Sequence, residues 1–296
     1  MVNCDARSIQ HVPMSNLLLH FFGWPATLIH GDPMVLDRWR FLGRRLPKVR
    51  ATGQRVLDIG CGTGALTMGI ARCGYDTVGL SWDERNQKVA TDRAAMLGLK
   101  NVTFPIGDAR HLDKRKDFIT RFDAVVCFEN IEHILNDRKL VQDMFRCLKP
   151  GGRLYLTSPN YNYRPLSAGD MGPFSSVEDG SHVRRGYTPC MLHELCQEAG
   201  FEIEEITFIS HFFSQIVTRL GRASSGIVGG RLAWLIILPL RPLPLFLDDW
   251  LGQWLGSLVG WPGYSIALVA YKSRFGLEAA REKESRCTAT ARLNNI

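Results

Sequence analysis

Residues 56–64 read Val-Leu-Asp-Ile-Gly-Cys-Gly-Thr-Gly, and this segment constrains the fold more than any other part of the chain. The apolar run 56–59 is typical of a strand buried in a parallel sheet. Gly60, Gly62 and Gly64 allow a tight turn that a ligand can approach closely, and the free N–H groups of a following helix attract negative charge. A strand, a glycine turn and a helix start together predict a nucleotide-type binding site.

The same turn also satisfies the loose fingerprint of a dinucleotide-binding site, because Gly60, Gly62 and Ala65 have the Gly-x-Gly-x-x-Ala spacing. Asp58 argues against that interpretation, since its carboxylate would repel a pyrophosphate. The dinucleotide fingerprint also requires an acid about 20 residues further on. The second predicted strand, 76–80, is instead followed by Ser81.

Five segments, in this order, resemble class I S-adenosylmethionine-dependent methyltransferases, and in particular their small-molecule, ubiquinone-type branch. They are 56–64, Gly107-Asp108-Ala109, Phe128-Glu129-Asn130-Ile131-Glu132-His133, Leu148-Lys149-Pro150-Gly151-Gly152-Arg153-Leu154, and the stretch from Tyr187-Thr188-Pro189 to Glu198-Ala199-Gly200-Phe201. The resemblance covers residues 55–210 and the stretch near 264–272. It implies an α/β fold of the Rossmann-like class I methyltransferase type, with a seven-stranded, mostly parallel sheet, helices on both faces, and S-adenosyl-L-methionine as cofactor.

The order of predicted elements agrees with such a sheet. Strands are predicted at 55–59, 76–80, 101–106, 122–127, 152–157, 202–209 and 264–272, and helices near 64–73, 84–97, 111–119, 137–148 and 188–199. This alternation favours right-handed crossovers and a sheet covered on both faces. The ligand is then expected beyond the carboxyl ends of the strands.

Five parts of the chain are distinguished by composition. An N-terminal helical cap spans 1–54 and holds an amphipathic helix at 34–46 that starts after Asp32-Pro33. The cofactor-binding core spans 55–210, an apolar insertion spans 211–262, the last core strand lies in 263–273, and a flexible tail follows at 274–296. Within the core, the long segment 160–186 follows the fifth strand and is expected to be a lid or a substrate wall, here called the lid.

The resemblance also implies roles for the residues around the cofactor. Asp58 would hold the turn or face the amino group of the cofactor. Three further groups are implied: Gly60, Cys61, Gly62 and Gly64 near the homocysteine part and ribose; Asp108 and Ala109 near the adenine; and Phe128, Glu129 and Asn130 at the methionine end. A second interpretation of Asp108 is a cap for the predicted helix 111–119.

The ribose contact departs from the family pattern, because Ser81 stands where an acid is usual. Asp83 is the nearest carboxylate, and it either contacts the ribose or caps the helix 84–97. Trp82 either lies along the adenine face or packs as an ordinary apolar side chain.

Methyl transfer is a backside displacement, so the protein contributes mostly positioning, and a base is needed only if the acceptor keeps its proton. The candidate bases are Glu132, His133 and His182. Glu132-His133 resembles a pair that in this branch often ties loops together, and both roles stay open. His182 lies in the lid and is either a base or acceptor-binding group, or a surface histidine.

The insertion 211–262 bears on the acceptor, because it is rich in Leu, Trp, Pro and Gly. Three interpretations stay open: an apolar acceptor pocket, a membrane-facing surface with its arginines near the headgroups, and a dimer contact or added core layer. The first two favour a small apolar or lipid-linked acceptor that is methylated on oxygen. The alternatives are C- or N-methylation of a quinone or polyketide-type product, and a binding protein of the same fold without turnover.

Composition narrows the partners and the compartment. The net charge of +7 is diffuse and argues against nucleic acid as the partner. The eight cysteines show no Cys-x-x-Cys pair, so we expect no metal site. We expect the cysteines to be free thiols in a reducing cytosol. There is no signal-peptide pattern, and the longest apolar run, 232–240, is shorter than the span of about 20 residues that crosses a bilayer. The sequence predicts a cytoplasmic protein, either free or peripheral on a membrane, with a homodimer as an open alternative.

Overall fold

The computed structural model describes residues 16–30, 34–49 and 51–274. The helix start predicted at Asp32-Pro33 and the tail at 275–296 lie outside the described residues.

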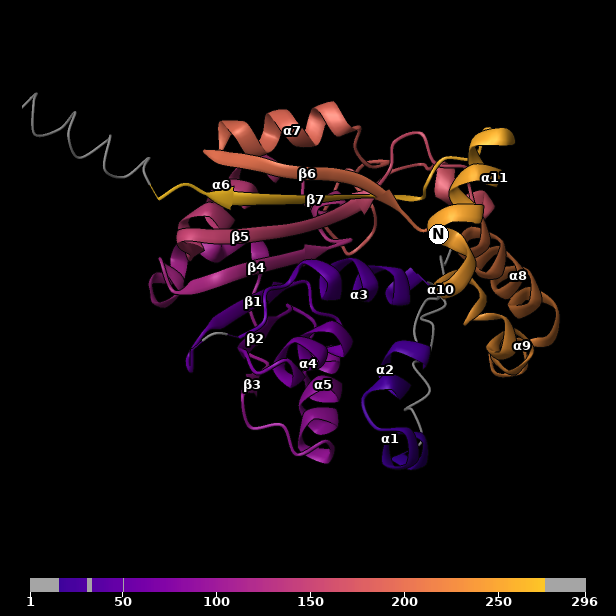
Figure 1. The fold of residues 1–296 in the computed structure, drawn as a ribbon, viewed down its shortest axis with the longest axis horizontal. Coiled ribbons are helices and arrows are strands. Elements are labelled where there is room, and N and C mark those ends of the chain that lie inside the picture. The colour runs from indigo at the N-terminus through magenta and orange to yellow at the C-terminus, as the bar shows by residue number, and fades with distance from the viewer. Residues whose placement is uncertain (1–15, 31–33, 50, 275–296) are drawn as a thin grey trace, which may run out of the picture.

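A single seven-stranded sheet, in the order β3-β2-β1-β4-β5-β7-β6, forms the centre of the molecule (Figure 1). Its strands are β1 (Arg55–Ile59), β2 (Asp76–Leu80), β3 (Val102–Thr103), β4 (Phe122–Phe128), β5 (Leu148–Pro159), β6 (Phe201–Ile209) and β7 (Ser265–Lys272). Strands β1 to β5 pair in parallel, and β7 lies antiparallel between β5 and β6. The predicted fold class is confirmed.

The predicted strand 101–106 is too long, since β3 contains only Val102–Thr103. Pro105 has no backbone N–H to donate to a ladder, and beyond it only an isolated bridge joins Ile106 to Ser81.

Helices cover the sheet and extend beyond it. Before and within the core they are α1 (Asn16–Phe22), α2 (Pro25–His30), α3 (Met34–Arg45), α4 (Ala65–Arg72), α5 (Glu84–Met96), α6 (Asp137–Cys147) and α7 (Pro189–Glu198). Short 3₁₀ turns are η1 (Ala109–Lys114), η2 (Lys116–Phe118), η3 (Ile131–His133) and η4 (Ala168–Met171). The single helix predicted at 111–119 is therefore wrong: the backbone leaves the helical region at His111, and the chain forms η1 and η2 instead.

The insertion 211–262 is almost entirely helical. It consists of α8 (Phe212–Val228), α9 (Gly230–Ile237), η5 (Leu238–Leu240), α10 (Leu243–Leu247), η6 (Asp248–Gly252) and α11 (Gln253–Leu258). In Figure 1 these helices lie at the end of the sheet toward which the arrows of β4 and β5 point. No helix in the described part of the chain combines the length and apolar character that a membrane crossing needs.

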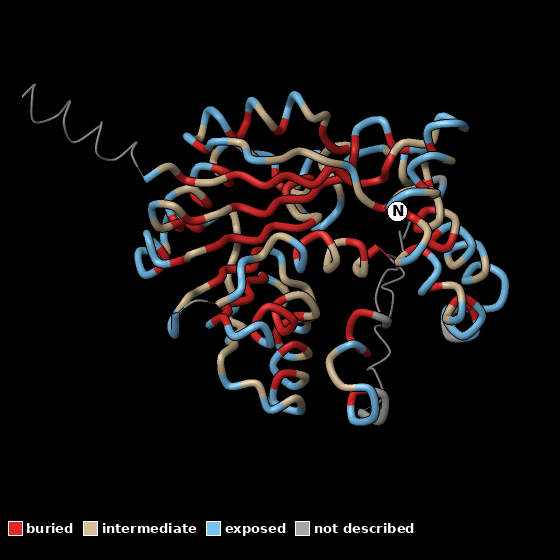
Figure 2. The backbone as a smooth tube through the Cα atoms, viewed as in Figure 1, coloured by how far each residue is buried: buried red, intermediate tan, exposed pale blue. Residues whose placement is uncertain are grey.

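The strands alternate their side chains between two apolar layers. Leu57, Val125 and Leu154 pack toward a core cluster that contains residues of α6 and α7. Val56, Val126 and Tyr155 pack toward a cluster with residues of α3 and α4. Figure 2 shows the strands as the most continuously buried part of the chain. Because both faces of the sheet are covered, these strands appear as apolar runs in the sequence. The carboxyl ends of the strands are the place where a ligand can approach the sheet.

Candidate functional site

The glycine turn lies at the carboxyl end of β1, beside the end of β2. Gly60, Gly62 and Gly64 have φ values of 74°, 52° and 77°, a backbone region that L side chains avoid. The N–H groups of Gly60 and Cys61 both donate to the carbonyl of Leu80, at 2.9 and 3.2 Å. These bonds fix the turn against β2.

The three glycines differ in what surrounds them. A Cβ atom on Gly60 would lie 2.6 Å from the Asn130 side chain, and one on Gly64 would lie 2.7 Å from the Phe104 ring. A Cβ atom on Gly62 would meet no atom within 4 Å. Gly62 therefore borders the open space in which a ligand can lie against the main chain.

Asp58 stabilises the turn from strand β1, which precedes it. Its carboxylate is 3 % exposed and accepts a hydrogen bond from the Thr67 hydroxyl at 2.6 Å. Burial raises the pKa of Asp58 to about 6, and the Thr67 hydrogen bond opposes that rise. The bond joins β1 to α4 and supports the turn-holding role of Asp58; a contact with an amino group stays a prediction.

The residues after β2 have separate roles. Asp83 caps α5, since its carboxylate accepts from the backbone N–H groups of Arg85 at 2.9 Å and Asn86 at 3.4 Å. Partial burial would raise its pKa, but the hydrogen bonds from Arg85 and Asn86 outweigh it and lower the pKa. Ser81 is buried, and its hydroxyl accepts from the N–H of Asp83 at 3.3 Å. The capping interpretation of Asp83 is confirmed, and a ribose contact stays a prediction.

Trp82 is 62 % exposed, so the interpretation as ordinary packing is wrong. A Cβ atom on Gly180 of the lid would lie 3.6 Å from the Trp82 ring. The ring thus lies under the lid with much of its surface free, as a stacking surface for a planar group would.

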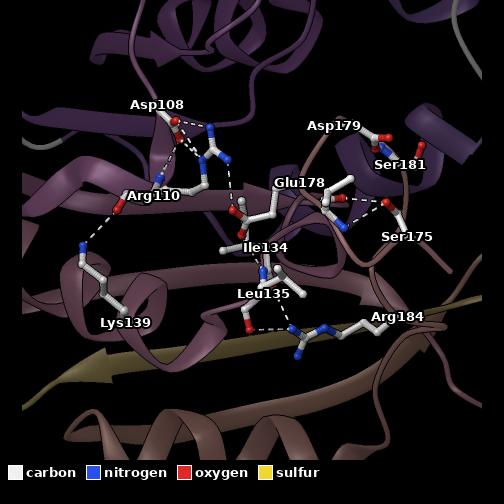
Figure 3. A network of polar contacts seen from close by, with 11 residues as sticks. Asp108, Arg110, Ile134, Leu135, Lys139, Ser175, Glu178, Asp179, Ser181 and Arg184 are labelled. Carbon is white, nitrogen blue, oxygen red and sulfur yellow. Dashed lines mark hydrogen bonds and ion pairs between the residues drawn. The ribbon is translucent and has the colours of Figure 1, made fainter.

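Asp108 forms the start of a polar network that the sequence did not reveal (Figure 3). It caps η1 by accepting from the N–H of Arg110 at 2.9 Å, and it binds the guanidinium of the same residue at 2.5 to 2.9 Å. Partial burial would raise the pKa of Asp108, but the hydrogen bonds of Arg110 prevail and lower it. The capping interpretation of Asp108 is thus correct for η1, while its predicted contact with adenine, like that of its half-buried neighbour Ala109, stays untested.

Arg110 also reaches the lid. Its guanidinium donates to Glu178 at 3.0 Å, and Glu178 accepts from the backbone N–H of Leu135 at 2.6 Å. Arg184 of the lid donates to the carbonyls of Ile134 and Leu135 at 2.7 and 2.9 Å (Figure 3). The lid is therefore bound to the segment that follows β4, over the candidate site.

The methionine end of the predicted site is formed where β4 ends. Phe128 is buried, and Glu129 has a positive φ of 47°. The Glu129 carboxylate lies 3.5 Å from the guanidinium of Arg38 on α3. Asn130 lies against Gly60. The cap helix α3 and the glycine turn thus meet the three predicted residues at this point.

Glu132, His133 and His182 lie together, although 49 residues separate the second from the third along the chain. The imidazole rings of His133 and His182 are 4.6 Å apart, and the possible ligand atoms of all three residues lie within 4.8 Å of one another. One Glu132 oxygen accepts from the Ser158 hydroxyl at 3.4 Å. The other oxygen and Nδ1 of His133 are buried and have no hydrogen-bond partner among the described residues.

Burial governs the charge of this cluster. It raises the pKa of the fully buried Glu132, and the nearby Glu129 charge raises it further. It lowers the pKa of His182 to about 4, with a further contribution from His133. His182 is half-buried and is not a surface histidine, because the lid backbone around it is bonded: Val183 N–H donates to the Glu132 carbonyl at 3.0 Å.

The three donors suit more than one chemistry. An imidazole that is uncharged near neutral pH can accept a proton. A carboxylate and two imidazoles also form a donor set that a divalent cation accepts. The sequence predicts no metal site. Among the described residues, however, Glu132, His133 and His182 have the geometry of a possible metal-binding group.

A separate hollow of about 480 Å³ lies between the end of β6 and α11. Its wall includes Thr207, His211, Gln253 and Trp261. Strands β7 and β5 separate β6 from β4 in the sheet. The hollow is therefore distinct from the site at the ends of β1 and β4.

Comparison with known proteins agrees with this geometry. A family model described as "Methyltransferase domain" matches residues 35–206. A "Ubiquinone biosynthesis O-methyltransferase" of Coxiella burnetii (strain Dugway 5J108-111) is 27 % identical over 168 residues, which cover 55 % of this chain and 70 % of that protein.

Two solved structures show the same fold. Phosphoethanolamine N-methyltransferase 2 of Haemonchus contortus in complex with S-adenosyl-L-methionine has a TM-score of 0.59 at 20 % identity, over 87 % of this chain and 60 % of that one. The [4+2]-cyclase SpnF has a TM-score of 0.53 at 22 % identity, over 80 % of each chain.

Proposed function

This chain belongs to the methyltransferase domain family and is an S-adenosylmethionine-dependent methyltransferase, and from that premise we propose that it methylates a hydroxyl oxygen of a small, apolar or lipid-linked acceptor. The relative from Coxiella burnetii, named for O-methylation in ubiquinone biosynthesis, supports the class of reaction. The cluster of Glu132, His133 and His182 carries the proposal for this chain.

The residues present fit the cofactor. The left-handed glycine turn leaves space at Gly62 in which a ligand can lie against the main chain, and the exposed Trp82 ring offers an apolar face. When bound, S-adenosylmethionine supplies a methyl group that is already activated by its sulfonium centre. Gly60, Gly62 and Gly64 would hold it, with Phe128 to Asn130 at its methionine end.

The chain's own contribution is then to orient the acceptor and to accept its proton. Correct placement of two reacting groups is worth about 7–11 kcal/mol. A hydroxyl acceptor must lose a proton during transfer, unlike a tertiary amine. Burial lowers the pKa of His182 to about 4, which leaves a ring nitrogen free to accept that proton near neutral pH but also makes His182 a weak base.

The lid is bound to the chain around this cluster, where Glu132 is fully buried. Glu178 and Arg184 hold the lid to the segment after β4, and Val183 holds it to Glu132. A water-poor site strengthens hydrogen bonds to the acceptor. If a divalent cation occupies the three donors, it would favour ionisation of a hydroxyl bound to it.

The test uses pairs of phenolic acceptors that carry either a free hydroxyl or the corresponding methyl ether, each with and without an isoprenoid tail. We expect mass gain only with the free hydroxyl, larger with the tail, and fragment ions that place the methyl on oxygen. Methylation of the blocked ether would locate the transfer on carbon and contradict the proposal. Dialysis against a chelator followed by re-addition of Mg²⁺ or Zn²⁺ separates the imidazole route from the cation route.

A further inference from the structure

The helical stretch 243–258 carries its apolar side chains on the outside. α10, η6 and α11 follow one another without a break. Phe246, Trp250, Trp254 and Leu258 recur every fourth residue and are 80 %, 80 %, 58 % and 69 % exposed. Positions two residues away, at Pro244, Asp248, Gly252 and Gly256, are buried. Because two residues turn a helix by roughly 200°, these rows face opposite directions.

The inward row holds this orientation. The carboxylate of Asp248 accepts from the backbone N–H groups of Phe213 at 2.7 Å and Ser214 at 3.1 Å, at the start of α8. A Cβ atom on Gly252 would collide with that carboxylate, and one on Gly256 would lie 2.6 Å from the carbonyl of Trp261. Turning the stretch to bury its aromatic row would break the Asp248 contacts and drive large side chains into this close packing.

Helix α9 adds a second apolar exposed face. Ala233 and Ile237 are buried, and the Ile237 side chain lies near Gly221 of α8. On the other side Leu232, Leu235 and Ile236 are each at least half exposed. Arg231 is the one charged residue in the sequence of α9, and exposed apolar side chains in such number are typical of a contact surface. We call the exposed row of α10, η6 and α11, formed by Phe246, Trp250, Trp254 and Leu258, the apolar face.

Charge favours an anionic occupant of this face. The insertion contains the acids Asp248 and Asp249, and the arginines Arg219, Arg222, Arg231 and Arg241. Asp248 is buried at α8, and Asp249 lies 2.6 Å from Arg40 and 2.8 Å from Arg44. Arg222 is likewise paired with Asp170 at 3.1 Å, and Arg241 is buried. The four arginines and two aspartates leave the insertion with a formal charge of +2, within a chain of +7, and this excess attracts an anionic surface.

We propose that the apolar face docks on the surface of a bilayer that contains anionic phospholipid, with the Phe246–Leu258 row at the headgroup boundary. Trp side chains suit that boundary because they are apolar with one polar N–H. The family match ends at residue 206, so this surface lies outside the shared domain. The insertion lies at the same end of the sheet as the carboxyl ends of β4 and β5 (Figure 1). Docking thus places the site near the source of a lipid-linked acceptor.

The experiment is flotation of the full chain with vesicles of phosphatidylcholine alone or mixed with phosphatidylglycerol. The test variant is Trp250→Ser with Trp254→Ser. Its matched control is Met96→Ser with Ile119→Ser, two residues that are also exposed but lie outside the insertion, at the end of α5 and between η2 and β4. Binding of S-adenosylhomocysteine, measured for each protein, shows that the variants are folded.

We expect wild type and the control to float with the mixed vesicles, less at high salt because screening weakens headgroup attraction. The partitioning of the test variant onto the mixed vesicles should be at least about tenfold weaker. Brominated lipid should quench tryptophan fluorescence of wild type more strongly than that of the variant.

Two results would overturn the proposal. Wild type that fails to float with either vesicle has no such surface. Light scattering gives the second result: wild type is a dimer that does not bind vesicles, and the test variant is a monomer. That result would assign the face to a second copy of the chain. Both readouts are independent of methyl transfer, so they stand whether or not the acceptor is a hydroxyl.

Discussion

The two sides of the site differ in how their polar and apolar groups are satisfied. On the cofactor side, at the ends of β1 to β3, each predicted carboxylate has a nearby partner: Asp58 with Thr67, Asp83 with Arg85, and Asp108 with Arg110. On the acceptor side, buried atoms of Glu132 and His133 lack a partner among the described residues. There the insertion also exposes Trp250 and Trp254.

This difference indicates a division of work. The cofactor side is organised before any ligand arrives, because the Leu80 carbonyl and the Asp58–Thr67 bond hold its turn and local hydrogen bonds hold its helix caps. Unpaired buried polar atoms are costly, by about 1–3 kcal/mol each, so those of the acceptor side indicate a group that completes them. Changes on the first side should therefore alter cofactor binding alone, and changes on the second should alter turnover while cofactor binding is preserved.

The largest expected effect is that of Gly62→Val. The new side chain would enter the open space beside the turn, and we expect binding of S-adenosylhomocysteine to fall by at least about 100-fold. The backbone φ of 52° adds strain of about 1–2 kcal/mol, so a lower melting temperature is expected as well. Isothermal titration calorimetry and thermal unfolding measure the two effects.

Gly98→Val is the matched control for that strain. Gly98 has a φ of 65° and also faces open space, but it lies in the turn between α5 and β3. It should lose similar stability and keep full cofactor affinity. Equal loss of affinity in the two variants would mean that strain, and not occupation of the site, explains the Gly62 result.

On the acceptor side we expect His182→Gln to lower kcat by about 100-fold, a usual loss for a removed acid–base group. The Kd for S-adenosylhomocysteine should stay within about twofold, since the imidazole faces His133 and not the glycine turn. His111→Gln, at an exposed position of η1, is the control and should behave as wild type. A His182 variant that loses cofactor affinity as much as turnover would remove the distinction between the two sides.

Asp108→Ala should weaken cofactor binding by about 1–3 kcal/mol, the cost of leaving a buried donor unpaired. The structure complicates this expectation, because Arg110 already occupies the carboxylate. Asp117→Ala removes the pair of the exposed Asp117 with Arg115, at 2.7 Å, and controls for charge. An Asp108 variant with an unchanged Kd, but a lower melting temperature, would restrict Asp108 to capping η1.

The sequence allowed the prediction of the parts that rest on local patterns. The glycine turn, the parallel strands and the caps at Asp83 and Asp108 each depend on residues a few positions apart. The seven-stranded sheet followed because buried parallel strands appear as apolar runs. The helix predicted at 111–119 is wrong, because the backbone leaves the helical region at His111 and the segment forms two 3₁₀ turns.

The contacts that join distant segments could not be predicted in this way. Nothing near Arg110 in sequence indicates Glu178, and nothing near His133 indicates that His182 lies 4.6 Å from it. The outward direction of Trp250 and Trp254 was equally hidden, because a row at every fourth residue predicts a buried face as readily as an exposed one. Only the partners of Asp248 and Gly252 determine which side is inside.

The smallest expected effect concerns the junction between the cap helix α3 and the insertion. Asp37 is buried there, and burial raises its pKa from 3.8 to about 7. The nearby charge of Asp248 also raises the pKa, whereas the hydrogen bond from Ser214 and the charge of Arg38 lower it. A carboxyl with a raised folded-state pKa binds its proton more tightly when folded. Asp37 should therefore reduce stability as pH rises from about 4 to about 7.

Asp37→Asn removes that titration while keeping the shape of the protonated carboxyl. We expect the variant to be more stable than wild type by about 1–2 kcal/mol at pH 8. The pKa shift sets an upper bound of about 1.4 kcal/mol for each pKa unit, and the expected difference is smaller because a buried site relaxes when its carboxyl ionises. The difference should vanish near pH 3, below the ordinary pKa of 3.8, where the carboxyl is protonated in the folded state and largely so in the unfolded one. Urea unfolding at both pH values measures it, and Asp76→Asn, at the exposed start of β2, is the control. An Asp37→Asn variant that is less stable than wild type at pH 8 would mean that the charged carboxylate holds the insertion to α3, and that this junction, like the cofactor side, is organised by paired charges.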